Sequence, residues 1–105
     1  MSKLKQYKMF IGGNWVDSET KKTFETLNPE NNKPWALVPE ASSKDVDDAV
    51  KAAHKAFEGE WPKLLPRERA KFLRAIGQKL RDNAELLGKV ETIDTGKLFR
   101  ETNKQ

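Results

Sequence analysis

The chain has 105 residues, of which 36% are hydrophobic and 34% are charged, and its net charge is +4. This length suits one small domain or part of a larger one, and it excludes several separate cores. The sequence contains no cysteine, which excludes disulfides, thiolate metal sites and a cysteine nucleophile within these residues.

The apolar run near the start, Met9-Phe10-Ile11, ends at Gly12 and is too short for a signal peptide. No window approaches the ~18 apolar residues that a membrane span needs. We therefore expect neither a secretory leader nor a membrane segment, and a cytoplasmic location is consistent with the absence of cysteine.

Strand-forming residues come first in the chain. Residues 7–16 and 23–27 are rich in aromatic and β-branched side chains, and the polar stretch 17–22 separates them. The pattern predicts two short antiparallel strands, with a third over residues 35–38. Pro29 ends the second strand, and Asn32 suits a turn because asparagine tolerates a left-handed backbone.

The first predicted helix covers residues 43–58. Ser42 and Asp45 have the spacing of a capping box, in which each side chain binds the other residue's backbone N–H. Apolar residues then recur at helical intervals from Val46 to Phe57, and Gly59 ends the helix.

The second predicted helix covers residues 66–82 and begins at Pro66, whose missing N–H costs nothing in the first turn. Leu73, Ile76 and Leu80 mark its buried stripe. Arg69 lies on the same stripe, and we interpret it as an internal tether to a carboxylate or carbonyl rather than as a substrate ligand.

Asn83 is predicted to cap a third helix over residues 84–95, with Gly96 at its end. Residues 98–105 are expected to begin a further element. The elements together predict an α/β fragment over residues 1–105: short N-terminal antiparallel strands at about 7–38, followed by three α-helices.

Other candidate binding residues have structural alternatives. The basic excess lies in residues 60–83, and one hypothesis is a nucleic-acid surface on the helical stripe shared by Arg67, Lys71, Arg74 and Arg81. Interleaved acids and the apolar stripe favour a solvated helix face, so we expect no nucleic-acid partner. His54, the single histidine, is expected at the surface, and the three tryptophans are expected to be buried.

Four blocks in a fixed order carry a resemblance to a known family. They are Phe10-Ile11-Gly12-Gly13-Asn14-Trp15-Val16, Phe24-Glu25-Thr26-Leu27-Asn28-Pro29, Asp45-Val46-Asp47-Asp48-Ala49-Val50-Lys51-Ala52-Ala53 with Ala56-Phe57, and Glu91-Thr92-Ile93-Asp94-Thr95-Gly96-Lys97. Together with Trp61 and Arg69, they resemble the amino-terminal portion of the NAD(P)-dependent aldehyde dehydrogenase superfamily, in its cofactor-binding domain.

The resemblance implies an oxidoreductase that converts aldehydes to carboxylic acids with NAD or NADP. In that family a cysteine thiolate attacks the aldehyde and a glutamate activates water. The catalytic residues and the cofactor-binding motifs lie in later sequence, so we expect no catalytic or cofactor-binding residue here and no activity from this chain alone.

One site is implied residue by residue. Many family members hold K⁺ or Na⁺ through backbone carbonyls beside the Asn-Pro pair and an aspartate near the helix end, which correspond here to Thr26, Leu27 and Asp94. The alternative is that Asp94 pairs with Lys97 or caps a neighbouring amide.

The resemblance also bears on partners. It implies an aldehyde substrate only in the complete enzyme, and a homo-oligomer is possible in the family. The alternative is a freestanding interaction module that binds a related full-length chain, because the predicted strands lack neighbours.

Overall fold

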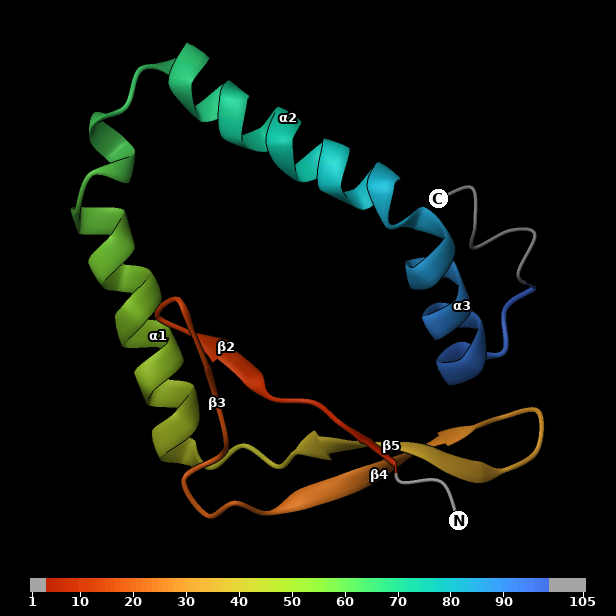
Figure 1. The fold of residues 1–105 in the computed structure, drawn as a ribbon. Coiled ribbons are helices and arrows are strands. Elements are labelled where there is room, and N and C mark those ends of the chain that lie inside the picture. Colours follow the sequence, from red (N-terminus) through yellow and green to blue (C-terminus); the bar gives the residue numbers. More distant parts are fainter. Residues whose placement is uncertain (1–3, 99–105) are drawn as a thin grey trace. The chain divides into compact units, whose positions relative to one another are not determined.

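The computed structural model describes residues 4–98, which form five β-strands, three α-helices and one short 3-10 turn (Figure 1). Strands come first and helices follow, as the sequence predicts. Of these residues, 4–26 and 34–63 form one compact unit, and 27–33 and 64–98 form a second. The further element expected after Leu98 lies outside the described residues.

Three strands form a sheet in the order β1-β5-β4. β1 (Lys5–Gln6) pairs in parallel with β5 (Lys33–Pro39), and β4 (Thr23–Asn28) lies on the other side of β5. Ala36 in the central strand is fully buried, and it is the only hydrophobic residue of the buried class within residues 4–98.

The remaining two strands form a hairpin, which corrects the predicted pairing of residues 7–16 with 23–27. β2 (Met9–Ile11) and β3 (Asn14–Val16) pair with each other in antiparallel fashion. Gly12 and Gly13 both have positive φ, 60° and 84°. A two-residue hairpin turn needs such angles, and glycine adopts them without steric cost. The segment therefore folds back on itself.

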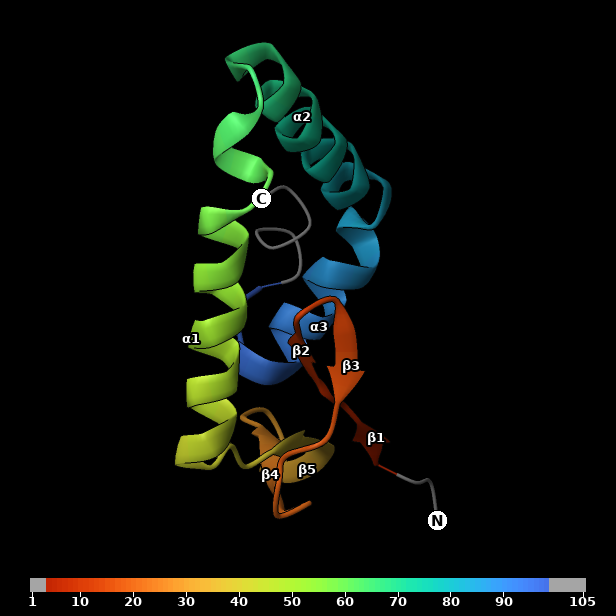
Figure 2. The ribbon, with the colours of Figure 1, turned by 90° about the vertical axis from the view of Figure 1, so that its left-hand side faces the viewer.

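α1 (Ser43–Glu58) lies beside this hairpin, as Figures 1 and 2 both show. A Cβ placed on Gly12 would lie 3.8 Å from the Cβ of Ala52, so the hairpin turn contacts the middle of the helix. Gly59 ends α1 as predicted, and the 3-10 turn η1 (Trp61–Lys63) follows.

α2 (Pro66–Asp82) and α3 (Ala84–Thr95) occupy the ranges that the sequence predicts. Pro66 stands in the first turn of α2, and Gly96 ends α3 in the left-handed conformation. Asn83 stands at the N-cap position of α3, as predicted, and its carbonyl accepts the N–H of Leu87 at 2.9 Å. Its side chain, however, makes no cap bond to α3, and its Nδ2 donates instead to the carbonyl of Lys79 at 2.9 Å, at the end of α2.

Two expectations of burial are also wrong. Leu73 and Ile76 are 64% and 57% exposed, and no residue of α2 is buried. Trp15 is 70% exposed, Trp61 is also exposed, and Trp35 is half-buried. The physical reason is that periodicity identifies an apolar face but does not show what covers it. Among the described residues, no residue of α2 is buried.

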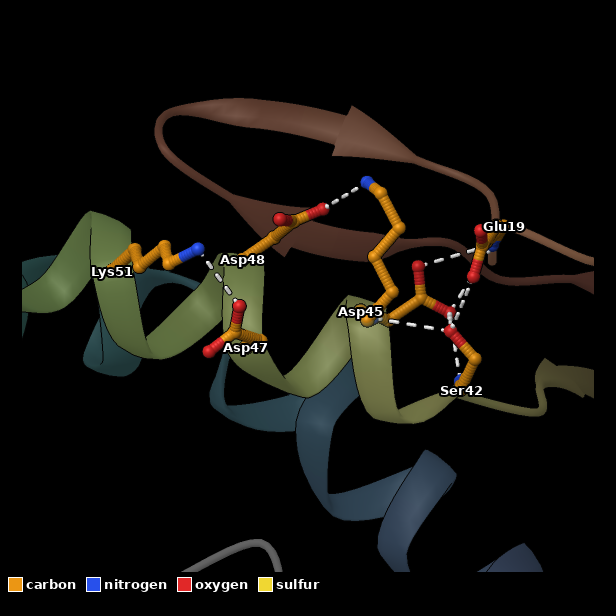
Figure 3. A network of polar contacts seen from close by, with 7 residues as sticks. Glu19, Ser42, Asp45, Asp47, Asp48 and Lys51 are labelled. Atoms are coloured by element: carbon orange, nitrogen blue, oxygen red, sulfur yellow. Dashed lines mark hydrogen bonds and ion pairs between the residues drawn. The ribbon is translucent and has the colours of Figure 1, made fainter.

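A buried carboxylate joins the start of α1 to the loop between β3 and β4 (Figure 3). Asp45 accepts the backbone N–H of Ser42 at 2.8 Å, and Ser42 Oγ accepts the N–H of Asp45 at 3.1 Å, which confirms the capping box. The carboxylate oxygens of Asp45 also accept the backbone N–H of Glu19, at 3.0 and 3.1 Å. This second contact spans 26 positions of sequence, so capping patterns do not reveal it.

The same contacts favour the charged form of Asp45. The hydrogen bond from the Ser42 backbone lowers the pKa of the Asp45 carboxyl, the Glu19 backbone lowers it further, and burial opposes both. A pKa that is lower in the folded state contributes stability at pH values above the unfolded value of about 3.9. That contribution is lost as pH falls through the folded value.

We predict that Asp45→Asn lowers the thermal midpoint of the chain at neutral pH, because an amide cannot accept all of these N–H groups. Since the wild type loses its advantage in acid, the difference between the two proteins should shrink as pH falls below about 4. Circular dichroism melts between neutral and acidic pH measure this.

Asp47→Asn is the matched control, because Asp47 is exposed and contacts Lys51 across one turn at 2.9 Å. Exposed pairs contribute little, so its midpoint should stay near that of the wild type. Equal thermal midpoints for the two variants at neutral pH would contradict the view that Asp45 stabilises the fold by joining the start of α1 to the loop between β3 and β4.

Candidate functional site

The predicted cation ligands come from a strand and a helix end. Thr26 and Leu27 lie in β4, and Asp94 lies in the last turn of α3. The segments that carry Leu27 and Asp94 meet: a Cβ placed on Gly96 would lie only 3.1 Å from Cγ of Pro29. The structure thus brings the Asn-Pro block and the helix-ending block together. Whether Thr26, Leu27 and Asp94 share an ion stays a prediction.

The turn after β4 is held by local hydrogen bonds. The carbonyl of Asn28 accepts the N–H of Asn32 at 2.7 Å, and Asn28 Oδ1 accepts the N–H of Glu30 at 2.9 Å. Asn32 has a φ of 56°, which confirms the predicted left-handed turn. These bonds fix the backbone of the turn that directly follows Leu27.

The end of α3 is constrained in a comparable way. Gly96 has a φ of 80°, and its N–H donates to the carbonyl of Thr92 at 2.9 Å. A side chain at this position would meet both backbone strain and Pro29. Sequence reasoning identified Gly96 as a helix end but missed its contact with Pro29, because nothing in the local pattern signals a contact across more than sixty residues.

The charges at this end suit a cation. The last turn of α3 has no basic residue, and the helix dipole places partial negative charge there beside Asp94. Lys97 lies beyond the helix and contacts Glu91 Oε1 at 3.6 Å. Carbonyl and carboxylate oxygens are ligands for a hard cation.

The described residues do not offer a side-chain cage for a metal. Within residues 4–98, no three or more histidine, cysteine, aspartate or glutamate side chains gather in a way that could hold one. A cation at the end of α3 would therefore rely largely on backbone carbonyls.

His54 and Arg69 both make local contacts with neighbouring residues. His54 is exposed, and its Nε2 lies 2.9 Å from Glu58 Oε1 on an open hollow of about 520 Å³ that Val50 and Gly59 also line. Arg69 Nη1 donates to the carbonyl of Leu64 at 2.9 Å, which confirms the internal tether. Neither arrangement places a nucleophile beside a base.

The helices were also compared with the length and hydropathy that a membrane span requires. Across residues 4–98, every helix is too short or too polar to cross a bilayer.

Comparison with known proteins identifies the family. The sequence profile described as "Aldehyde dehydrogenase family" matches residues 15–105. An aldehyde dehydrogenase of Aspergillus niger is 46% identical over 89 residues, which cover 85% of this chain and 18% of that protein. Aldehyde dehydrogenase family 2 member C4 of Arabidopsis thaliana is 40% identical, over 95% of this chain and 20% of its own length.

Solved structures agree. An aldehyde dehydrogenase mutant from Bacillus cereus superposes with a TM-score of 0.92 at 37% identity, over 96% of this chain and 21% of that one. Betaine aldehyde dehydrogenase from Staphylococcus aureus, in complex with NAD⁺, superposes with a TM-score of 0.89 at 38% identity. The match covers 92% of this chain and 20% of that one. The chain thus spans about a fifth of the length of the relatives it matches, and it belongs to the aldehyde dehydrogenase family.

Proposed function

We propose that this chain serves as amino-terminal scaffold in the cofactor-binding domain of an NAD(P)-dependent aldehyde dehydrogenase. The observation that carries the proposal is the match in both sequence and fold over nearly the whole chain, against only a fifth of each relative. The oxidation of an aldehyde to a carboxylic acid would belong to the complete protein.

The residues present do not fit a dinucleotide site by themselves. The sequence has no glycine-rich phosphate loop of the G-x-G-x-x-G type, and it has no cysteine to attack an aldehyde. The NAD⁺ bound by the Staphylococcus relative supports NAD as the cofactor of the complete protein. This chain would contribute shape and support to that site rather than direct ligands.

A chimera tests the scaffold role. Residues 15–105 would replace the matched segment of the full-length Aspergillus enzyme, which is 46% identical over the aligned region. We expect a soluble chimera that oxidises aldehydes with NAD. A chimera that folds as the parent does but shows no activity would contradict the proposal.

We also propose that Thr26, Leu27 and Asp94 contribute to a site for K⁺ or Na⁺. The contact between Pro29 and Gly96 and the negative end of α3 support it. The carbonyls of Thr26 and Leu27 and the carboxylate of Asp94 would hold the ion. Such an ion would offset the unfavourable placement of Asp94 in a final helical turn.

We predict that the 105-residue chain alone forms no NADH or NADPH from an aldehyde, because the nucleophile and the cofactor loop are missing. Absorbance of the reduced nicotinamide measures this, with heat-treated chain as the blank and the full-length Aspergillus enzyme as the positive control. Turnover above the blank would contradict the prediction.

We predict that KCl raises the thermal midpoint of the chain relative to choline chloride at equal concentration. Potassium at ten times its dissociation constant adds about 1.4 kcal/mol, which corresponds to a rise of roughly 5–10 °C for a small domain. Asp94→Asn should abolish most of this difference.

Asp82→Asn is the control, since it removes the same charge from the last turn of α2 and should preserve the potassium effect. If the wild type melts at the same temperature in both salts, the isolated chain holds no such ion.

A further inference from the structure

The loop between β3 and β4 contains a turn that is closed by its own hydrogen bonds. The carbonyl of Ser18 accepts the N–H of Lys21 at 2.9 Å, and Ser18 Oγ donates to the carbonyl of Lys22 at 3.3 Å. Ser18 is buried, and Lys21 has a φ of 60°, in the left-handed region that residues other than glycine adopt rarely. Residues 18–22, the 18–22 turn, therefore keep their shape through contacts within the loop.

A separate set of contacts attaches this turn to the start of α1 (Figure 3). The backbone N–H of Glu19 donates to both carboxylate oxygens of Asp45, at 3.0 and 3.1 Å. Ser42 Oγ lies 3.1 Å from Glu19 Oε2 and 3.0 Å from Asp45 Oδ2, and its single proton can serve only one of the two carboxylates at a time. All of these residues belong to one compact unit. The Asp45 carboxylate is thus the acceptor that holds the backbone of the turn.

The start of α1 does not depend on Asp45 alone. Ser42 Oγ accepts the N–H of Asp45 at 3.1 Å, and the carbonyl of Ser42 accepts the N–H of Val46 at 3.1 Å. Neither acceptor belongs to the side chain of Asp45. Protonation of that side chain would weaken its hold on the N–H groups of Ser42 and Glu19, while these two bonds would still begin the helix.

The charged groups that face Asp45 come from the loop and from α1. Glu19 presents its carboxylate to the same hydroxyl as Asp45, and Lys44 lies near both acids, although its Nζ binds Asp48 at 2.9 Å. The pKa of Asp45 is lowered chiefly by the backbone N–H of Ser42 and then by that of Glu19. The attachment is therefore complete at neutral pH and is lost as pH falls through the folded pKa of Asp45.

We propose that the 18–22 turn is an acid-released strap: ionised Asp45 holds it against the start of α1, and protonation of Asp45 detaches its Glu19 end while α1 stays helical. The Lys22 end stays attached, because its carbonyl accepts the backbone N–H of Glu40 at 2.9 Å. The strap opens as a local unit rather than through unfolding of the whole chain. This proposal is independent of the scaffold and cation roles proposed above.

Amide hydrogen exchange, read by NMR on the 105-residue chain, tests the strap. Each rate is expressed as protection relative to an unstructured amide at the same pH. Between pH 7 and about pH 2.5 we expect the protection of the Glu19 amide to fall by about tenfold or more, because hydrogen bonds to charged groups are the stronger ones. Amides in the middle of α1, such as that of Ala52, should keep their protection over this range.

Two variants separate the strap from the helix cap at neutral pH. Asp45→Asn should lower the protection of the Glu19 amide by about tenfold, because the charged acceptor is gone. Ser42→Ala removes the hydroxyl but leaves the Asp45 carboxylate, so it should leave the Glu19 amide protected and expose the amide of Asp45 instead. Asp47→Asn is the matched control and should change neither amide.

Several results would overturn the proposal. If the Glu19 and Ala52 amides lose protection together as pH falls, the loop opens only when the chain unfolds. Unchanged protection of Glu19 in Asp45→Asn, or its loss in Ser42→Ala, would show that Asp45 is not the group that holds the strap. Circular dichroism accompanies each variant, and a loss of helix in Asp45→Asn at neutral pH would show that the strap does not open separately from α1.

Discussion

Burial of apolar side chains is the constraint on which this chain depends. Its elements have the amphipathic patterns of core-forming strands and helices, yet Ala36 is the only hydrophobic residue of the buried class within residues 4–98. Water in contact with apolar surface is the main cost that folding removes. Within residues 4–98 little of the surface of these hydrophobic residues, 36% of the chain, is buried, which fits the scaffold role proposed above.

Local hydrogen bonds fix where the helices begin and how one loop is placed. The carboxylate of Asp45 caps α1 and also holds the backbone of Glu19, so one side chain both starts a helix and positions a loop. Glu68 Oε1 accepts the N–H of Leu65 at the start of α2, at 2.9 Å. Such contacts specify where helices begin without a large core, because they satisfy backbone groups that the first turn leaves unpaired.

The contact between Pro29 and Gly96 lies at the cation site proposed above. It joins the turn after β4 to the end of α3, and both segments belong to the blocks that carry the family resemblance. In the cation site proposed above, this contact would help to hold the backbone near Leu27 and Asp94 in place. The catalytic chemistry of the family needs a nucleophile that these residues lack.

The sequence by itself determined the three helices, the cap at Ser42, the helix start at Pro66 and the helix end at Gly96. It also determined the tether at Arg69 and the family, because each of these features depends on residues close together or on blocks in a fixed order. Only the tertiary structure decided that residues 9–16 form their own hairpin, that β5 lies between β1 and β4, and that Leu73 and Ile76 face solvent. The reason is physical. Periodicity and capping report local backbone preference, whereas strand pairing and burial depend on which distant surface is present to supply the partner.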